Sequence, residues 1–241
     1  MPDIPLVRTD GKVFSAGITL SPERFVHAEL LSRASKSDHA RETEKVYGLG
    51  DSLYFFAGYA CPGFGDVVFI FEASCLDGVD GGATPFDTGG LYGRKIFARA
   101  WDGLDRAAED EARRELVAQS QRSLSDWRSA LDEYLSEFFD TPREYLRGDR
   151  PRKDDASGRL GDARNSRRAW TWEVRAHADL PIGQGLRRIW ASADYEEAIR
   201  QQVLTMNDDK RKSWNERVGK RLVRVAPGES PHARAEAELT S

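Results

Sequence analysis

Two short runs of apolar residues constrain the fold of this chain more than any other feature. Ser52–Ala57 and Asp66–Glu72 carry apolar side chains at both odd and even positions. Successive side chains of a strand point to opposite faces of a sheet, so such runs are typical of strands that are covered on both faces. The connection between them, Gly58–Gly65, is too rich in Gly and Pro for a long helix. We therefore expect the centre of a sheet at residues 52–72.

A helical stretch separates these strands from a second strand-rich segment. Glu109 and Arg113 stand at i,i+4 spacing, and Ser123–Asp126 has capping-box spacing, which predicts two helices instead of one long helix. Strand patterns return at residues 169–175 and 186–190. This order predicts an α+β protein with a mixed or antiparallel sheet core, built from residues 1–100 and 169–192, and a helical insertion at residues 102–148.

The remaining segments are assigned from local signals. Ser21 and Pro22 open a helix that we expect to reach about Ala34. Residues 77–93 are expected to form a Gly-rich loop, and residues 147–168 a mobile, Arg-rich linker with almost nothing apolar to bury. A helix is expected from about Asp194 to Leu204. We expect one α+β domain over residues 1–225 and a disordered tail at 226–241.

Cysteine usage and hydropathy narrow the class of protein. Cys61 and Cys75 are the only cysteines, and neither has a histidine at metal-ligand spacing, so the sequence supports neither a disulfide framework nor a metal site. No apolar run approaches the roughly eighteen residues that cross a bilayer, and the N-terminus lacks the pattern of a signal peptide. We therefore expect a cytoplasmic protein with no membrane partner.

Two familiar motifs are present only in part. Gly50-Asp51-Ser52-Leu53 has the letters of the GDSL esterase signature, but no apolar strand precedes it and no histidine follows an aspartate at the spacing that this family uses. The glycines between Gly78 and Gly93 lack the Gly-Lys-Ser/Thr ending of a phosphate loop. Neither an esterase nor a nucleotide-binding loop is favoured.

An aromatic strand and a later acidic strand together resemble ADP-ribosyltransferases of the DarT type. Leu53–Pro62 followed by Val67–Phe71 is similar to the aromatic strand, Pro-containing turn and second strand of those enzymes. Trp172-Glu173-Val174-Arg175, followed by Leu180-Pro181, looks like the strand that carries their catalytic glutamate. The resemblance covers residues 20–75 and 169–192, and it implies a transferase that uses NAD as its substrate.

The resemblance also implies roles for four residues. Glu173 would be the catalytic carboxylate, with His27 as a second catalytic candidate. Tyr54 would stack in the nicotinamide pocket, and Arg41 would meet the pyrophosphate. Each residue has a plainer interpretation: Glu173 as a solvent-facing strand residue, Tyr54 as core packing, Arg41 as a solvated cation, and His27 as a histidine on a helix face.

A nucleic-acid-binding or protein-interaction module without catalysis is the alternative function. Of the 36 cationic residues 28 are arginines, and arginine suits bidentate contact with phosphate. A basic arm at residues 143–168 would gain affinity for nucleic acid by counterion release. The arginines of this arm that we assign to the contact are Arg143, Arg147, Arg150, Arg152, Arg167 and Arg168.

Overall fold

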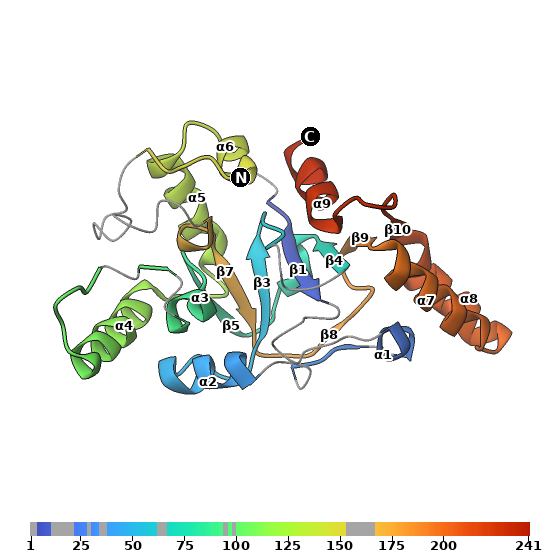
Figure 1. Ribbon diagram of the computed structural model, residues 1–241, viewed down its shortest axis with the longest axis horizontal. Helices are drawn as coiled ribbons and strands as arrows, with labels where there is room; N and C mark the ends of the chain where they lie inside the picture. Colours follow the sequence, from blue (N-terminus) through green and yellow to red (C-terminus); the bar gives the residue numbers. More distant parts are fainter. Residues whose placement is uncertain are drawn as a thin grey trace.

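The structure is a computed structural model that describes residues 4–10, 22–27, 30–33, 38–61, 67–93, 96–97, 100–152 and 167–241. Its centre is an eight-stranded sheet (Figure 1). In the order in which they lie in that sheet, the strands are β10 (Leu222–Arg224), β9 (Leu186–Ala191), β4 (Val67–Phe71), β1 (Leu6–Asp10), β3 (Leu53–Ala57), β7 (Glu173–Ala176), β5 (Gly81–Thr84) and β6 (Arg122–Ser123). A separate two-stranded sheet pairs β2 (Leu30–Leu31) with β8 (Leu180–Pro181).

The sheet confirms the predicted α+β fold. Strand β7 pairs antiparallel with β3, with Val174 opposite Phe55, so the two strand-rich segments form one sheet across the helical insertion. Strand β10 is parallel to β9 while the other pairs are antiparallel, which makes the sheet mixed. Strands β6 and β10 lie outside the two segments that were expected to supply the sheet.

Nine helices surround this sheet within the described residues. They are α1 (Pro22–His27), α2 (Asp38–Tyr47), α3 (Thr88–Tyr92), α4 (Arg106–Ser120), α5 (Trp127–Phe138), α6 (Pro142–Arg147), α7 (Ala193–Leu204), α8 (Asp208–Arg217) and α9 (Pro231–Thr240), with short 3-10 turns η1 (Ala73–Leu76), η4 (Arg167–Ala169) and η5 (Gly219–Arg221). In Figure 1, α4 lies at one end of the long axis of the molecule and α7 and α8 lie at the other.

The helical insertion forms as predicted. Helix α4 begins after Asp105, whose side chain accepts a hydrogen bond from the Ala108 amide at 2.9 Å, and ends at Ser120. Helix α5 buries Trp127, Leu131 and other apolar residues at three- and four-residue spacing. The break between α4 and α5 contains the expected turn and adds β6 to the sheet edge.

Residue parity divides the sheet into two chemically different faces at β3, β7 and β5. Residues that are paired across strands share a face. Phe55, Val174 and Ala83 therefore line the face that joins the main apolar core. The opposite face carries polar residues on the same three strands, and the candidate site lies there.

The first expected helix is shorter than the sequence suggests. Helix α1 ends at His27, and Leu30 and Leu31 pair with Pro181 and Leu180 as a short strand. Most of the expected linker, residues 153–166, lies outside the described residues.

The C-terminal segment differs from the disordered tail expected at residues 226–241. Residues 231–240 form α9, which packs on β4, β9 and α6. Ala235 and Leu239, one helical turn apart, are buried with Val68 and Ile70 of β4. Only these two residues form the apolar face of α9 in this contact. Because the face is so small, the composition of the segment did not indicate a packed helix.

Truncating Leu239 is therefore expected to destabilise the fold. Leu239→Ala should lower the free energy of unfolding by about 2–3 kcal/mol, because it removes buried methyl groups from the contact between α9 and the sheet. Leu204→Ala is the matched control, since Leu204 is 64% exposed, and it should change stability by less than about 0.5 kcal/mol. Urea unfolding measures both values. If both variants lose the same small amount of unfolding free energy, the contact between α9 and the sheet does not stabilise the fold.

Candidate functional site

Glu173 lies at the start of β7 and is buried, with 2% of its surface exposed. Its carboxylate accepts three hydrogen bonds. The Thr88 hydroxyl donates to Oε1 at 2.6 Å, the Thr88 amide donates to Oε2 at 3.2 Å, and Nη1 of Arg175 donates to Oε1 at 2.9 Å. The interpretation of Glu173 as a solvent-facing strand residue is therefore wrong.

Thr88 reaches Glu173 because α3 begins at that point. Asp87 caps the helix, and its side chain accepts from the Gly90 amide at 2.7 Å. The same carboxylate is ion-paired with Arg168. The expected Gly-rich loop at 77–93 thus contains strand β5 and helix α3, and it delivers a hydroxyl and an amide to the sheet.

Arg175 lies two residues after Glu173, on the same face of β7. Its side chain is fully buried, and Nη1 contacts Glu173 at 2.9 Å and Thr84 Oγ1 at 3.4 Å. Among the described residues, Nε and Nη2 of Arg175 have no hydrogen-bond partner. A buried arginine with two unpaired donors is unusual, because each unpaired buried polar group costs free energy.

Tyr54 stands beside this pair on the neighbouring strand. It is in register with Arg175, so the two residues share a face of the sheet. The Tyr54 hydroxyl donates to Oε1 of Glu44 at 3.2 Å, and the same oxygen accepts from the Ser52 amide at 2.9 Å. Helix α2 therefore holds Glu44 over the cluster. We call Glu44, Tyr54, Thr88, Glu173 and Arg175 the Glu173 cluster.

Burial controls the electrostatics of the Glu173 cluster. Removal from water raises the pKa of Glu173 to about 7, and the charge of Asp87 adds to this effect. The charge of Arg175 and the hydrogen bonds from Thr88 and Arg175 lower the pKa and so limit the shift. Burial, with the charges of Glu173 and Glu44, also raises the pKa of Tyr54, whose hydroxyl stays protonated. Glu173 can thus exchange a proton near neutral pH.

The other two expected site residues lie away from Glu173. His27 is exposed at the end of α1, which packs on α7 at the far end of the sheet. Arg41 is exposed on α2, the helix that carries Glu44 inward. The structure therefore brings Tyr54 and Glu173 together but adds neither His27 nor Arg41 to their buried contacts.

Most arginines of the basic arm are held by the protein itself. Arg152 is ion-paired with Asp140, and Arg168 with Asp87. Arg167 contacts Glu236 of α9 at 2.8 Å, and its guanidinium lies over the Tyr59 ring at 4.3 Å. Arg147 contacts Asp149 at 3.1 Å, and Arg143 donates to the Thr240 carbonyl at 2.8 Å. These contacts give the arm a structural role at the junction of α5, α6 and α9.

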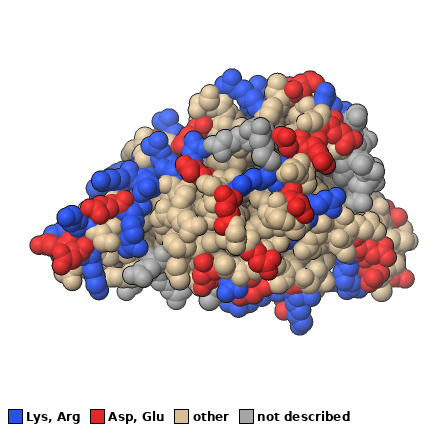
Figure 2. Space-filling view, turned by 180° about the vertical axis from the view of Figure 1, so that it is seen from behind, with Lys and Arg blue, Asp and Glu red and all other residues tan. Residues whose placement is uncertain are grey.

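Charges of both signs are mixed on the face of the molecule that Figure 2 shows. In Figure 2, which shows the molecule from behind, Lys and Arg side chains are interspersed with Asp and Glu instead of gathering into one cationic patch. No helix in the described part of the chain is long and apolar enough to cross a membrane. Within the same residues, no group of three or more His, Cys, Asp or Glu is arranged to hold a metal ion.

Four other side chains are candidate nucleophiles or bases. Two of them are engaged in hydrogen bonds with backbone carbonyls, and the two thiols are protonated at neutral pH. The Ser52 hydroxyl is buried and donates to the Leu49 and Gly50 carbonyls at 3.4 and 3.2 Å. Nε2 of His177 lies 2.9 Å from the Leu49 carbonyl oxygen, so that ring nitrogen is engaged by the backbone. Burial raises the pKa of both Cys61 and Cys75 to about 12, which keeps these thiols protonated at neutral pH.

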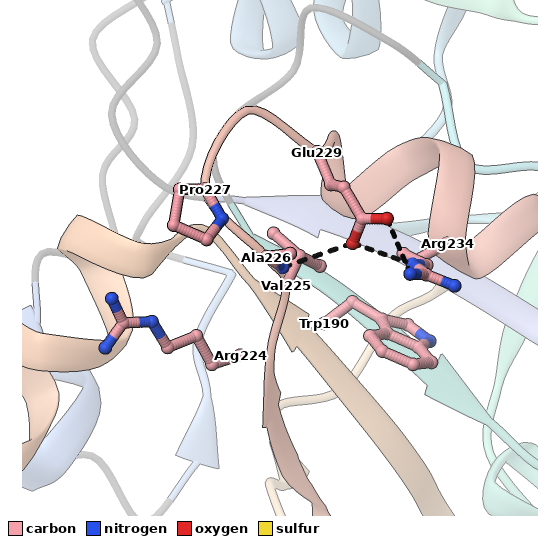
Figure 3. A pocket seen from close by; sticks show the side chains of 7 residues that line it. All are labelled: Trp190, Arg224, Val225, Ala226, Pro227, Glu229 and Arg234. Atoms are coloured by element: carbon pink, nitrogen blue, oxygen red, sulfur yellow. Dashed lines mark hydrogen bonds and ion pairs between the residues drawn. The ribbon is translucent and has the colours of Figure 1, made fainter.

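An open pocket lies at the other end of the sheet (Figure 3). Glu229 accepts hydrogen bonds there from the Ala226 amide at 3.1 Å and from Nε of Arg234 at 2.9 Å, while Trp190 and Arg224 line its sides. The Trp190 indole donates to Glu238 at 2.8 Å. None of the Glu173 cluster lines this pocket, so the two sites are separate.

The chain matches no protein-family model, no curated protein and no solved structure. The geometry of the Glu173 cluster is therefore the basis on which we infer a function.

Proposed function

We propose that the Glu173 cluster carries out NAD-dependent ADP-ribosyl transfer to a macromolecular acceptor, or cleavage of NAD. The observation that carries the proposal is a buried carboxyl held between Thr88 and Arg175, and burial raises the pKa of this carboxyl to about 7. A group that titrates near neutral pH can both accept and return a proton during a reaction. Perturbed pKa values of this kind gather at functional sites.

The chemistry assigns Glu173 two tasks. The bond between the nicotinamide nitrogen and C1′ of the ribose breaks, and nicotinamide leaves with the electron pair of that bond. The ribose then carries positive charge, which the carboxylate stabilises. An acceptor oxygen or nitrogen forms the new bond to C1′, and its proton passes to Glu173. With water as the acceptor, the same steps amount to NAD cleavage.

The local charge suits the nicotinamide end of NAD. The nicotinamide ring of NAD is cationic, and Glu44 and Glu173 supply two carboxyls on the face that also carries the ring of Tyr54. Cations are stabilised by carboxylates and by aromatic faces. Tyr54 is only partly buried, which makes it the most exposed residue of the cluster.

Access to Glu173 requires a movement. Helix α3 covers the carboxylate through Thr88, and α2 packs on α3 and holds Glu44 on Tyr54. The proposal therefore includes a separation of α2 and α3 from β7 when NAD enters, as in enzymes that close over their substrates.

A nucleic acid is the acceptor that the remaining charges favour. Arg143 is exposed on α6, and its partner, the Thr240 carbonyl, does not neutralise its charge. The non-catalytic alternative, a binding module that uses residues 143–168, has less support, because Arg152, Arg167 and Arg168 are ion-paired within the protein.

Incubation of the wild-type protein with NAD tests the proposal. We expect release of nicotinamide, and we expect NAD to raise the melting temperature, because a ligand that binds only the native state stabilises it. Nicotinamide is measured by chromatography, with and without single-stranded DNA, RNA or protein as the acceptor. If no nicotinamide appears with any acceptor and NAD leaves the melting temperature unchanged, the proposal is wrong.

A further inference from the structure

The guanidinium of Arg175 has one edge in use and one edge unpaired. Nη1 is bonded to Glu173 and Thr84, whereas Nε and Nη2 have no partner among the described residues. The N–H bonds of Nε and Nη2 point in nearly the same direction on one side of the planar group. This side is the fork that binds two oxygens of a carboxylate or phosphate at once.

A second buried arginine shows what a satisfied fork looks like in this protein. Arg113 is 2% exposed, and both Nε and Nη2 donate to Oε1 of Glu109 while Nη1 donates to the Leu91 carbonyl. Burial alone therefore does not leave an arginine unpaired here. The fork of Arg175 lacks an acceptor that the fork of Arg113 has.

Gly82 lies beside this fork. It is paired with Arg175 across β5 and β7, and a Cβ on Gly82 would lie 3.3 Å from Nη2 of Arg175 and 3.1 Å from Nε2 of Gln121. Two side-chain N–H donors thus converge over Gly82, where any side chain would crowd them. Gln121, at the end of α4, is partly exposed, which links the buried fork to the surface.

We propose that the Nε–Nη2 edge of Arg175, together with the side-chain amide Nε2 of Gln121, binds two oxygens of an anionic group, either a phosphate or a carboxylate. Two donors that share one direction and a third donor beside them, converging over a residue without a side chain, suit such a group. If the site is part of the NAD-binding site, it would receive a phosphate of NAD, and this version of the proposal rests on the proposed function. Binding of an anion by Arg175 does not itself depend on the proposed function.

Anion binding is measured first on the wild-type protein. Inorganic phosphate, pyrophosphate, acetate and ADP-ribose are titrated in thermal-shift assays against sodium chloride of equal ionic strength, which removes the effect of screening on exposed charges. We expect a saturable rise in melting temperature with phosphate or pyrophosphate if the group is a phosphate, and with acetate if it is a carboxylate. No rise with any of the four would overturn the proposal.

Two variants assign the binding to the fork. Arg175→Lys keeps the charge but loses the paired donors, so the dissociation constant of the anion should rise at least about tenfold. Arg113→Lys is the matched control, because the fork of Arg113 is already filled by Glu109, and it should leave the constant unchanged. An equal effect of both substitutions would contradict the assignment.

Gly82→Ala keeps the test decisive if Arg175→Lys does not fold. The added methyl group would crowd Nη2 and the Gln121 amide while the bond from Nη1 to Glu173 stays in place, so anion binding should again weaken about tenfold or more. Gly183→Ala is the control, since its Cβ would make an ordinary 3.5 Å contact with Arg217. Unchanged affinity in Gly82→Ala would overturn the proposal.

The two proposals can fail separately. If the wild type releases nicotinamide but Arg175→Lys binds phosphate and NAD as well as the wild type does, the anion site is wrong and the proposed function stands. If phosphate binds through Arg175 but no nicotinamide is released with any acceptor, the anion site stands and the NAD-dependent function is wrong.

Discussion

Replacing Glu173 with Gln is expected to slow the release of nicotinamide from NAD by roughly two to four orders of magnitude. The glutamine side chain can still accept a hydrogen bond from the Thr88 hydroxyl. It can neither carry the negative charge that stabilises the ribose cation nor take the proton of the acceptor. NAD affinity should change little, because the loss falls on the transition state. Steady-state kinetics and NAD titration of the same preparation separate the two effects.

A second buried glutamate provides the control for this substitution. Glu196 of α7 is 1% exposed and is ion-paired with Arg200, and it lies outside the Glu173 cluster. Glu196→Gln should release nicotinamide at the wild-type rate. If both variants lose activity alike, or if Glu173→Gln keeps the wild-type rate, Glu173 has no catalytic role.

The central strands could be predicted because their signal is local. Strands β3 and β4 lie within the runs 52–57 and 66–72, and all of their residues except the partly buried Tyr54 are buried, at both parities, as expected. The break between α4 and α5 was predicted for the same reason, since the capping signal is contained in a few residues. In such segments the local pattern and the tertiary fold favour the same conformation.

Elements that depend on distant partners were not predicted. Helix α9 is stabilised by Val68 and Ile70 of β4, more than 150 residues earlier in the chain. Leu30 and Leu31 leave a helical pattern because they pair with β8. A weak local preference gives way to such contacts.

The candidate site was predicted only in part, for a similar reason. The strand pattern placed Glu173 on a strand, but its burial depends on Thr88, 85 residues away, and on the registers that bring β3, β7 and β5 together. One local signal could have pointed to Arg175, because residues i and i+2 of a strand share a face. Arg41 and His27 are exposed on α2 and α1, and no sequence signal separated them from other exposed polar residues.

The contribution of Glu173 to protein stability should fall as the pH rises from about 4.5 to 7. Burial raises the pKa of Glu173 from 4.5 to about 7, so the folded protein holds this proton more tightly than the unfolded chain does. The stabilisation from the protonated carboxyl is therefore complete below about pH 4.5 and is lost as the pH rises through 7. The shift corresponds to about 3 kcal/mol over this window.

Other carboxylates titrate at the acidic end, so the quantity to measure is the difference between the wild type and Glu173→Gln, in which their contributions cancel. Urea unfolding at several pH values should show the wild type losing stability relative to the variant as the pH rises, and the trend should persist at high salt because the cause is burial and not a screened surface charge. A difference that is flat with pH, or one that grows in favour of the wild type, would mean that Arg175 and Thr88 outweigh burial and hold Glu173 ionised, and acid-base chemistry at this carboxyl would lose its basis.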